Sequence, residues 1–222
     1  MLCNNIWKLV EKYIIHHFYN RYIFISDFMK KIKPGKLIVI CGPSGTGKKT
    51  VWSGIIDKKK YNTIFSVSMT TRERRPGEVE GKDYFFVGKT KFNNAIENGE
   101  LLEWATYVNN FYGTPKNFVK ENLKKGINVF LEIEMQGCLN VFKNWKNKKQ
   151  LLSIFIAPPS LTELEKRLRN RRTEPEIIIK QRILQSKWEL TKKDLFKYVI
   201  INDTVAKAKR RLSMILNKEL LK

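Results

Sequence analysis

The chain has 222 residues, of which 42% are hydrophobic and 12% aromatic, so it can form one globular domain with a substantial core. This composition excludes a mostly disordered chain, and because no run of about 18 uninterrupted apolar residues occurs, we expect no membrane span. The formal net charge of +22 favours ligands that carry several phosphates. The lysines are spread along the chain without a zinc-finger, RNP or homeodomain pattern, so we expect no nucleic-acid partner.

The cysteines and histidines exclude two further kinds of site. Cys3, Cys41 and Cys138 are far apart and form no C-x-x-C pair, which argues against a zinc site or a disulfide framework and fits a reducing compartment. The two histidines, His16 and His17, lie outside the region that carries the motifs, which argues against a histidine general base.

The N-terminal segment, residues 1–33, is aromatic and basic and differs in character from the rest of the chain. It could be an amphipathic helix that docks on the body, an organelle-targeting leader or a dispensable extension. Glu11, Asp27 and the scarcity of serine weigh against a leader. We therefore expect a cytoplasmic location, with an organellar one as the alternative if residues 1–33 act as a leader. We also expect a monomer and not an obligate oligomer.

From Pro34 onward, apolar runs alternate with amphipathic ones, and the apolar runs have the continuous character of parallel strands covered on both faces. Strands are expected at 37–41, 64–69, 128–134, 151–157 and 198–201. Helices are expected after Lys48, Ser160, Thr173 and Thr204, and the stretches 160–163 and 173–176 are typical capping boxes. The pattern predicts an α/β fold with a five-stranded parallel sheet flanked by helices.

A glycine-rich stretch from Gly42 to Lys48 follows the first expected strand and reads G-x-x-x-x-G-K. In a loop of this pattern the glycines let consecutive backbone N–H groups converge on an anion, and the lysine bridges phosphate oxygens. The pattern continues with Ser or Thr, whose hydroxyl binds Mg²⁺, whereas this chain has Lys49 there. The stretch predicts a nucleotide phosphate site that lacks one hydroxyl.

Residues 66–123 interrupt the alternation with short, aromatic, turn-rich pieces, so we expect a small mixed lobe inserted in the core. Arg72 and Arg75, followed by the turn at 76–77, can converge on one phosphate with forked geometry, and Ser68 and Tyr84 can add hydroxyl donors. A solvated basic loop is the alternative. The interleaved hydroxyls and the turn favour a second phosphate site.

From about residue 36 to the C-terminus, the chain resembles guanylate kinases in motif order. The resemblance rests on the block Thr-Thr-Arg…Arg-x-Gly-Glu at 70–78 and on the stretches 81–84, 101–104, 112–114, 132–137 and 156–160. It implies a P-loop nucleoside-monophosphate-kinase fold. The core would comprise residues 34–65, 126–158 and 188–222, the GMP-binding lobe residues 66–125, and a helical lid over ATP residues 159–187.

The resemblance also implies the roles of individual residues. The GMP phosphate ligands would be Ser68, Arg72, Arg75, Tyr84 and Tyr112. The base-reading and acidic positions would be Glu78, Glu103, Thr114 and Glu134. A carboxylate such as Glu103 can accept from the N1–H and the 2-amino group of guanine together, and the Thr114 hydroxyl can donate to O6. Adenine would leave the carboxylate unpaired, which can give discrimination of about 10⁴-fold.

The ATP end is implied in the same way. The ATP-binding positions would be Gly42, Pro43, Ser44, Gly45, Thr46, Gly47, Lys48, Lys49, Thr50, Arg167, Arg171 and Asn202. The catalytic charges would come from Lys48, Arg72, Arg167, Arg171 and Arg182. The resemblance implies a Mg²⁺ ion held mainly by nucleotide phosphates and water, with Glu132 in reach of that water. Glu132 and Glu134 stand where relatives have aspartates, and Arg172 stands where a glycine is common.

The implied reaction is in-line transfer of the ATP γ-phosphoryl group to GMP, and also to dGMP. It needs no side-chain base, because a phosphate monoester with a second pKa of about 6 is mostly dianionic near neutral pH. The alternative is a guanylate-kinase-like phosphopeptide-binding module, which keeps the GMP lobe and loses loop and lid residues. The retained Gly42, Gly45, Gly47 and Lys48 favour the enzyme.

Overall fold

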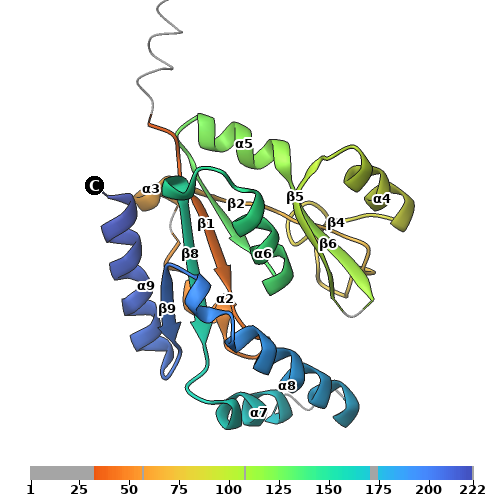
Figure 1. Cartoon of the computed structure of the whole chain (residues 1–222), viewed down its shortest axis with the longest axis vertical. Coiled ribbons are helices and arrows are strands. Elements are labelled where there is room, and N and C mark those ends of the chain that lie inside the picture. The colour runs from red at the N-terminus through yellow and green to blue at the C-terminus, as the bar shows by residue number, and fades with distance from the viewer. Residues whose placement is uncertain (1–32, 57, 108, 171–174, 222) are drawn as a thin grey trace, which may run out of the picture.

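Five parallel strands form the central sheet of the computed structural model, which describes residues 33–56, 58–107, 109–170 and 175–221 (Figure 1). The strands are β1 (Leu37–Cys41), β2 (Thr63–Phe65), β7 (Asn128–Glu132), β8 (Leu151–Ala157) and β9 (Tyr198–Ile201). Their order is β2-β7-β1-β8-β9, and each neighbouring pair is parallel. The predicted α/β class with a five-stranded parallel sheet is confirmed.

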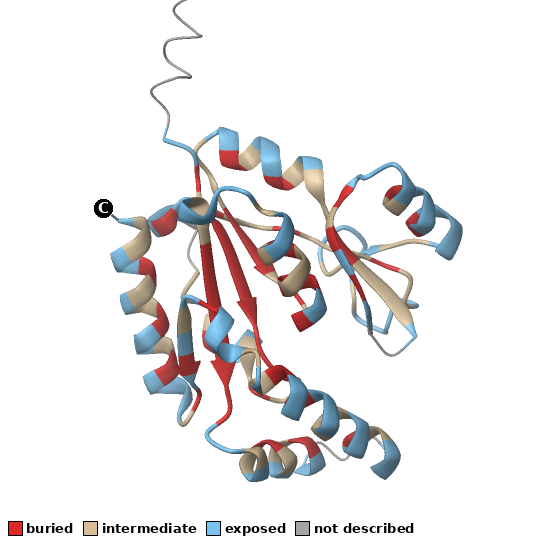
Figure 2. Cartoon of the chain, in the orientation of Figure 1, coloured by how far each residue is buried: buried red, intermediate tan, exposed pale blue. Residues whose placement is uncertain are grey.

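The middle strand β1 is buried on both faces, as its continuous apolar sequence predicts. Leu37, Val39 and Cys41 pack in one apolar cluster, and Ile38 and Ile40 pack in the other. The buried residues accordingly concentrate in this sheet and in the inner faces of its helices (Figure 2).

Helices cover each face of the sheet. On the side of Leu37 lie α5 (Lys116–Lys124) and α6 (Met135–Asn144), which contribute Val119, Leu123 and Val141 to the cluster. On the other side lie α2 (Lys48–Trp52), α3 (Lys58–Tyr61) and α9 (Val205–Leu220). Short 3₁₀ turns, η1 (Lys148–Gln150) and η2 (Lys193–Leu195), precede β8 and β9. No helix in the described ranges has the length and apolar character needed to cross a membrane.

A second sheet of four short strands lies apart from the first (Figure 1). It contains β3 (Met69–Thr70), β4 (Phe85–Phe86), β5 (Leu101–Tyr107) and β6 (Asn110–Pro115), in the order β4-β3-β6-β5. The helix α4 (Lys89–Glu97) closes its own small core by burying Phe92 and Ala95 against Leu101. The smaller core is the physical basis of a separate lobe.

Two of the expected strands were wrong in extent. The run 64–69 is divided, because Ser66 still donates to the Phe130 carbonyl of the central sheet at 3.0 Å, whereas the Ser68 carbonyl accepts from Phe85 of the lobe at 2.9 Å. The run 128–134 ends as a strand at Glu132, and Glu134 occupies the N-cap position of α6. Both errors occur where the chain leaves the central sheet at the same edge.

Two further helices, α7 (Leu161–Asn170) and α8 (Glu176–Leu190), form a hairpin held by Leu164, Leu168 and Ile179 (Figure 1). Ser160 Oγ accepts from the Glu163 N–H at 3.1 Å, which confirms the cap predicted there. The Glu163 carboxylate accepts from Arg167 and does not close the reciprocal half of the box. Thr173, the other predicted cap, lies outside the described residues, and Pro175 is the N-cap of α8.

Candidate active site

The loop between β1 and α2 follows the carboxyl end of a central parallel strand, which is where open α/β sheets bind ligands. Gly42 has φ of 147°, and a Cβ there would lie 2.1 Å from the Ile156 carbonyl oxygen of β8. Gly47, at φ of 78°, begins α2 in a left-handed conformation. Glycine is therefore required both for the turn itself and for its close approach to β8.

Polar contacts hold this loop closed. Thr46 is buried, and its hydroxyl donates to the Pro43 carbonyl at 2.8 Å. The Asn202 side-chain amide, which follows β9, donates to the Thr46 carbonyl at 2.7 Å. Lys48 Nζ lies at the loop's own carbonyls, 2.6 Å from that of Gly42 and 3.3 Å from that of Pro43. The loop is thus shaped before any anion binds, with an ammonium group at its centre.

The helical hairpin brings arginines to the same loop. Arg182 of α8 donates to Ser44 Oγ at 2.5 Å. Arg167 of α7 donates to the Glu163 carboxylate at 2.9 Å and to the Asn202 carbonyl at 3.2 Å. Arg171 lies outside the described residues, so its predicted role stays a prediction.

On the lobe, the guanidinium of Arg72 is held from several sides. It donates to Glu78 Oε1 at 2.6 Å and to the Glu73 carbonyl at 2.7 Å, and it lies over the rings of Tyr84 and Phe86 at 5.4 and 5.7 Å. The other Glu78 oxygen accepts from the Arg75 N–H at 2.8 Å. The hydrogen bond to Glu78 raises the Arg72 pKa, so Arg72 is a fixed cation.

The lobe's hydroxyl groups surround this cation. The rings of Tyr84 and Tyr112 meet edge to face at 5.8 Å, and burial raises the pKa of Tyr84 to about 12, so its hydroxyl keeps its proton. Ser68 lines the same cavity. These hydroxyls and the Arg72 guanidinium together offer hydrogen-bond donors to an anion.

Glu103 is a buried carboxylate on β5. Its Oε1 accepts from the Thr114 hydroxyl of β6 at 2.5 Å, and only 5% of the residue is exposed. Burial raises its pKa to about 7, and repulsion from Glu134 adds to this rise, while the Thr114 hydrogen bond opposes it. Burial likewise raises the pKa of Glu134, which Lys48 opposes.

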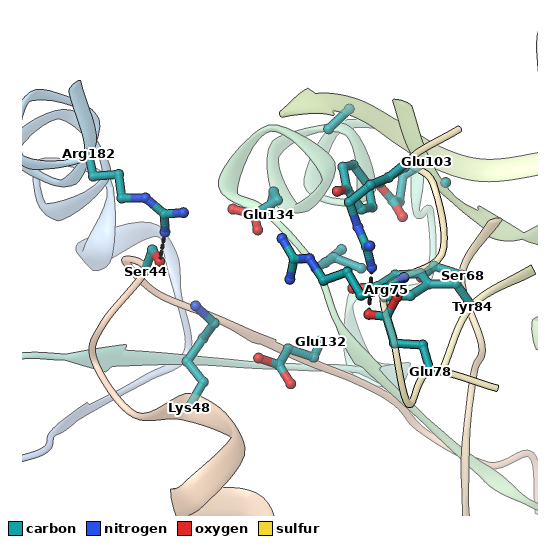
Figure 3. Close-up of a pocket in the computed structure, with 15 residues that line it drawn as sticks. Ser44, Lys48, Ser68, Arg75, Glu78, Tyr84, Glu103, Glu132, Glu134 and Arg182 are labelled. Atoms are coloured by element: carbon teal, nitrogen blue, oxygen red, sulfur yellow. Dashed lines mark hydrogen bonds and ion pairs between the residues drawn. The ribbon is translucent and has the colours of Figure 1, made fainter. Parts of the chain in front are cut away.

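These groups meet in one cavity of about 600 Å³. In Figure 3, Ser44, Lys48 and Arg182 lie on one side, Ser68, Glu78, Tyr84 and Glu103 on the other, and Glu132 and Glu134 between them. The predicted site residues that line it are Ser44, Lys48, Ser68, Arg72, Arg75, Glu78, Tyr84, Glu103, Tyr112, Glu132, Glu134 and Arg182. Cationic groups therefore stand on opposite sides of one space.

Other predicted positions lie near this cavity without lining it. Thr114 and Asn202 are buried behind Glu103 and behind the loop, respectively. Thr50 is exposed on the first turn of α2, and Lys49 beside it borders a neighbouring cavity of about 420 Å³ that also includes Lys48 and Glu132. Lys49, which stands where the loop pattern has Ser or Thr, thus borders this second cavity and does not line the main one.

Sequence reasoning did not single out Glu189 of α8, a carboxylate that is only 3% exposed and does not line the main cavity. Burial raises its pKa to about 7, repulsion from Glu134 adds to the rise, and Lys48 opposes it. Its Oε2 has no hydrogen-bond partner among the described residues. The signal was available, because Glu189 lies seven residues after Arg182 and hence on the same helix face.

The acidic residues of the cavity offer oxygen donors suited to Mg²⁺. Glu132 Oε2 accepts from Trp52 Nε1 at 2.7 Å, a contact that fixes the carboxylate and that no sequence signal announced. Among the described residues, no group of three His, Cys, Asp or Glu side chains could hold a metal ion.

The buried carboxylates predict how stability depends on pH. A carboxyl whose pKa rises from 4.5 to about 7 on folding binds its proton more tightly in the native state, so its contribution to stability is complete below pH 4.5 and lost as pH rises through about 7. We expect the free energy of unfolding of the substrate-free protein to fall between pH 5 and pH 8, and Glu189→Gln to remove up to about 3 kcal/mol of that fall.

Urea unfolding of the wild type and of Glu189→Gln, at pH 5 and at pH 8, checks this expectation. Glu97→Gln, a change of the same kind at an exposed position on α4, is the control and should leave the pH dependence as in the wild type. Equal pH dependence in Glu189→Gln and the wild type would contradict the assignment of a raised pKa to Glu189.

The family model described as guanylate kinase matches residues 34–219. Among curated proteins, the guanylate kinase of Wolbachia pipientis wMel is 44% identical over 188 residues, covering 85% of this chain and 92% of that protein. The guanylate kinase of Streptococcus thermophilus strain CNRZ 1066 is 48% identical over 185 residues, covering 83% and 87%.

A solved structure agrees with these sequence matches. The crystal structure of guanylate kinase from Anaplasma phagocytophilum superposes with a TM-score of 0.67 at 32% identity, and the match covers 86% of this chain and 88% of that one. The matched residues 34–219 include the cationic groups on both sides of the cavity. On the family model and these relatives, the chain belongs to the guanylate kinase family.

Proposed function

We propose that this chain transfers the γ-phosphoryl group of ATP to GMP, and also to dGMP, to give ADP and GDP. The observation that carries the proposal is the single cavity with Lys48 and Arg182 on one side and Arg72 on the other. An enzyme that joins two polyanions needs cationic groups for both, placed so that the transferred phosphoryl group lies between them. The family membership supports the same reaction.

At the ATP end, we assign the loop of residues 42–48 to the β- and γ-phosphates. Its closed shape and the Lys48 ammonium group suit a chain of phosphates, which would replace the two carbonyl contacts that Lys48 makes. Arg182, at Ser44, would meet the developing charge of the transferred group. Asn202 would hold the loop in place through the Thr46 carbonyl.

At the GMP end, we assign Arg72 and Arg75 to the acceptor phosphate and Glu103 with Thr114 to the base. Glu78 holds Arg72 rigid, so less conformational entropy is lost on binding. Ionised Glu103 accepts the N1–H and 2-amino donors that guanine presents together, and the Thr114 hydroxyl that now contacts Glu103 can turn to O6. The N1–H and 2-amino groups of guanine would supply the hydrogen bonds that this buried carboxylate does not receive from water.

The chemistry needs only positioning and charge. The GMP phosphate is already mostly dianionic near pH 7, so no residue has to remove a proton. A bound Mg²⁺ ion would neutralise charge on the nucleotide phosphates, and Glu132, fixed by Trp52, would orient a water molecule toward it. The α7–α8 hairpin carries Arg167 and Arg182 and would exclude water when it closes over the cavity. The cytoplasmic location stays part of the proposal.

The acceptor range tests the proposal. With ATP and Mg²⁺, we expect ADP release with GMP and dGMP, and a kcat/KM at least about 10³-fold lower with AMP or UMP, because Glu103 would face unmatched groups. Removal of Mg²⁺ by a chelator should abolish turnover. Equal rates with AMP would contradict the base assignment, and no turnover with any acceptor would favour the phosphopeptide-binding alternative.

A substitution at Arg72 tests the division of the cavity between the two nucleotides. We expect Arg72→Ala to raise the KM for GMP by about 10- to 100-fold, the effect of losing charge-assisted hydrogen bonds, while the KM for ATP changes by less than about 2-fold. Arg74→Ala removes the same charge from an exposed position of the same loop and is the matched control. Loss of affinity for both nucleotides in Arg72→Ala would contradict the assignment of Arg72 to GMP alone.

A further inference from the structure

Gly137, in the first turns of α6, contacts the carboxylate that we assign to guanine. A Cβ added at Gly137 would lie 2.1 Å from Glu103 Oε2 and 2.9 Å from Glu103 Cδ. Both distances are shorter than non-bonded atoms tolerate, so any side chain at position 137 would have to displace the Glu103 carboxylate or move the helix away from β5. The Glu103 side chain occupies the space in which a side chain at position 137 would lie.

The backbone conformation does not explain why glycine stands at position 137. Gly137 is the third residue of α6, and alanine is a better helix former than glycine. It is also not among the glycines with positive φ. The space for Glu103 is therefore the physical reason for glycine at this position.

A second contact from the same face of α6 fixes the neighbouring backbone. Asn140, three residues after Gly137, donates from its side-chain amide to the Trp104 carbonyl of β5 at 3.1 Å. Gly137 and Asn140 thus contact consecutive residues of β5. Because α6 packs on the central sheet and β5 belongs to the lobe sheet, this face of α6 sets where the lobe's carboxylate stands relative to the core.

The two oxygens of Glu103 lie near different elements of the fold. Oε1 accepts from Thr114 at 2.5 Å, and Oε2 lies against Gly137. In the substrate-free site the Thr114 hydrogen bond holds the carboxylate next to α6, and the N1–H and 2-amino groups of guanine would hold it there once Thr114 turns to O6. A methyl group at position 137 would therefore act directly on the orientation of the two acceptor oxygens.

We infer that Gly137 is a specificity-determining positioning residue, which keeps the Glu103 carboxylate in the orientation that accepts the N1–H and 2-amino donors of guanine. The inference rests on the proposed function and deepens it, because it states what sets the base preference of the site. Gly137 acts through Glu103 and does not line the cavity that holds the phosphate-binding groups.

The first test compares acceptors in Gly137→Ala. We expect the KM for GMP to rise at least about 10-fold while the KM for ATP changes less than about 2-fold, because only the base contact is disturbed. The preference for GMP over inosine monophosphate, which lacks the 2-amino group, should fall by at least about 5-fold. Gly88→Ala is the matched control, since a Cβ at Gly88 meets no atom within 4 Å.

A double-mutant cycle with Glu103→Ala separates this role from a general packing defect. Without the Glu103 carboxylate the added methyl group has space, so Gly137→Ala should change the kcat/KM for GMP by less than about 2-fold in the Glu103→Ala background. An equal cost of Gly137→Ala in both backgrounds would overturn the inference, as would no effect of Gly137→Ala in the wild type.

Folding and function are distinguished in the same set of proteins. If Gly137→Ala fails to fold and the double variant with Glu103→Ala folds, the clash with Glu103 is supported, whereas failure of both variants to fold would overturn the inference. A wild-type protein that shows no preference for GMP over inosine monophosphate and AMP would instead overturn the proposed function.

Discussion

The parallel pairing of β1 with β7 and β8 is the constraint on which the rest of the site depends. It aligns the carboxyl ends of three strands at one edge of the sheet, and each end contributes to the cavity or its support. The loop after β1 carries Lys48, the end of β7 and the residues after it carry Glu132 and Glu134, and β8 presents the Ile156 carbonyl against Gly42. Because β1 is buried on both faces, this edge is a rigid base for charged groups.

Charged groups of the cavity, on the central sheet and on the lobe, are held by specific partners. Glu78 holds Arg72, Trp52 holds Glu132, and Lys48 offsets the negative charge of Glu134. Glu103, Glu134 and Glu189 nevertheless keep a raised pKa, because the cost of burying their charged forms exceeds what their partners return. The substrate-free site thus retains buried carboxylates whose charged forms are costly, and ligands that bring hydrogen-bond donors or cations relieve that cost. The site is organised for ligands at the expense of stability.

Much of the fold and of the candidate site could be predicted from the sequence, for reasons that differ among residues. The loop at 42–48 and the pair Arg72 and Arg75 are local patterns, and the continuous apolar strands are visible as runs. The division of 64–69 was not predictable, because its two ends pair with different sheets and no glycine or proline stands between them. The contacts of Trp52 with Glu132 and of Gly137 with Glu103 join residues 80 and 34 positions apart, and neither leaves a local signature.

If one cavity accepts both nucleotides with their phosphates in line, a single molecule that joins the two nucleosides through phosphates should fill both ends of it. The most direct measurement is calorimetric titration with adenosine and guanosine joined 5′ to 5′ by five phosphates, in the presence of Mg²⁺. We predict one molecule bound per chain, at least about 100-fold tighter than ATP or GMP alone, because both ends are engaged at once. Binding no tighter than that of the stronger single nucleotide, or two molecules per chain, would contradict the account.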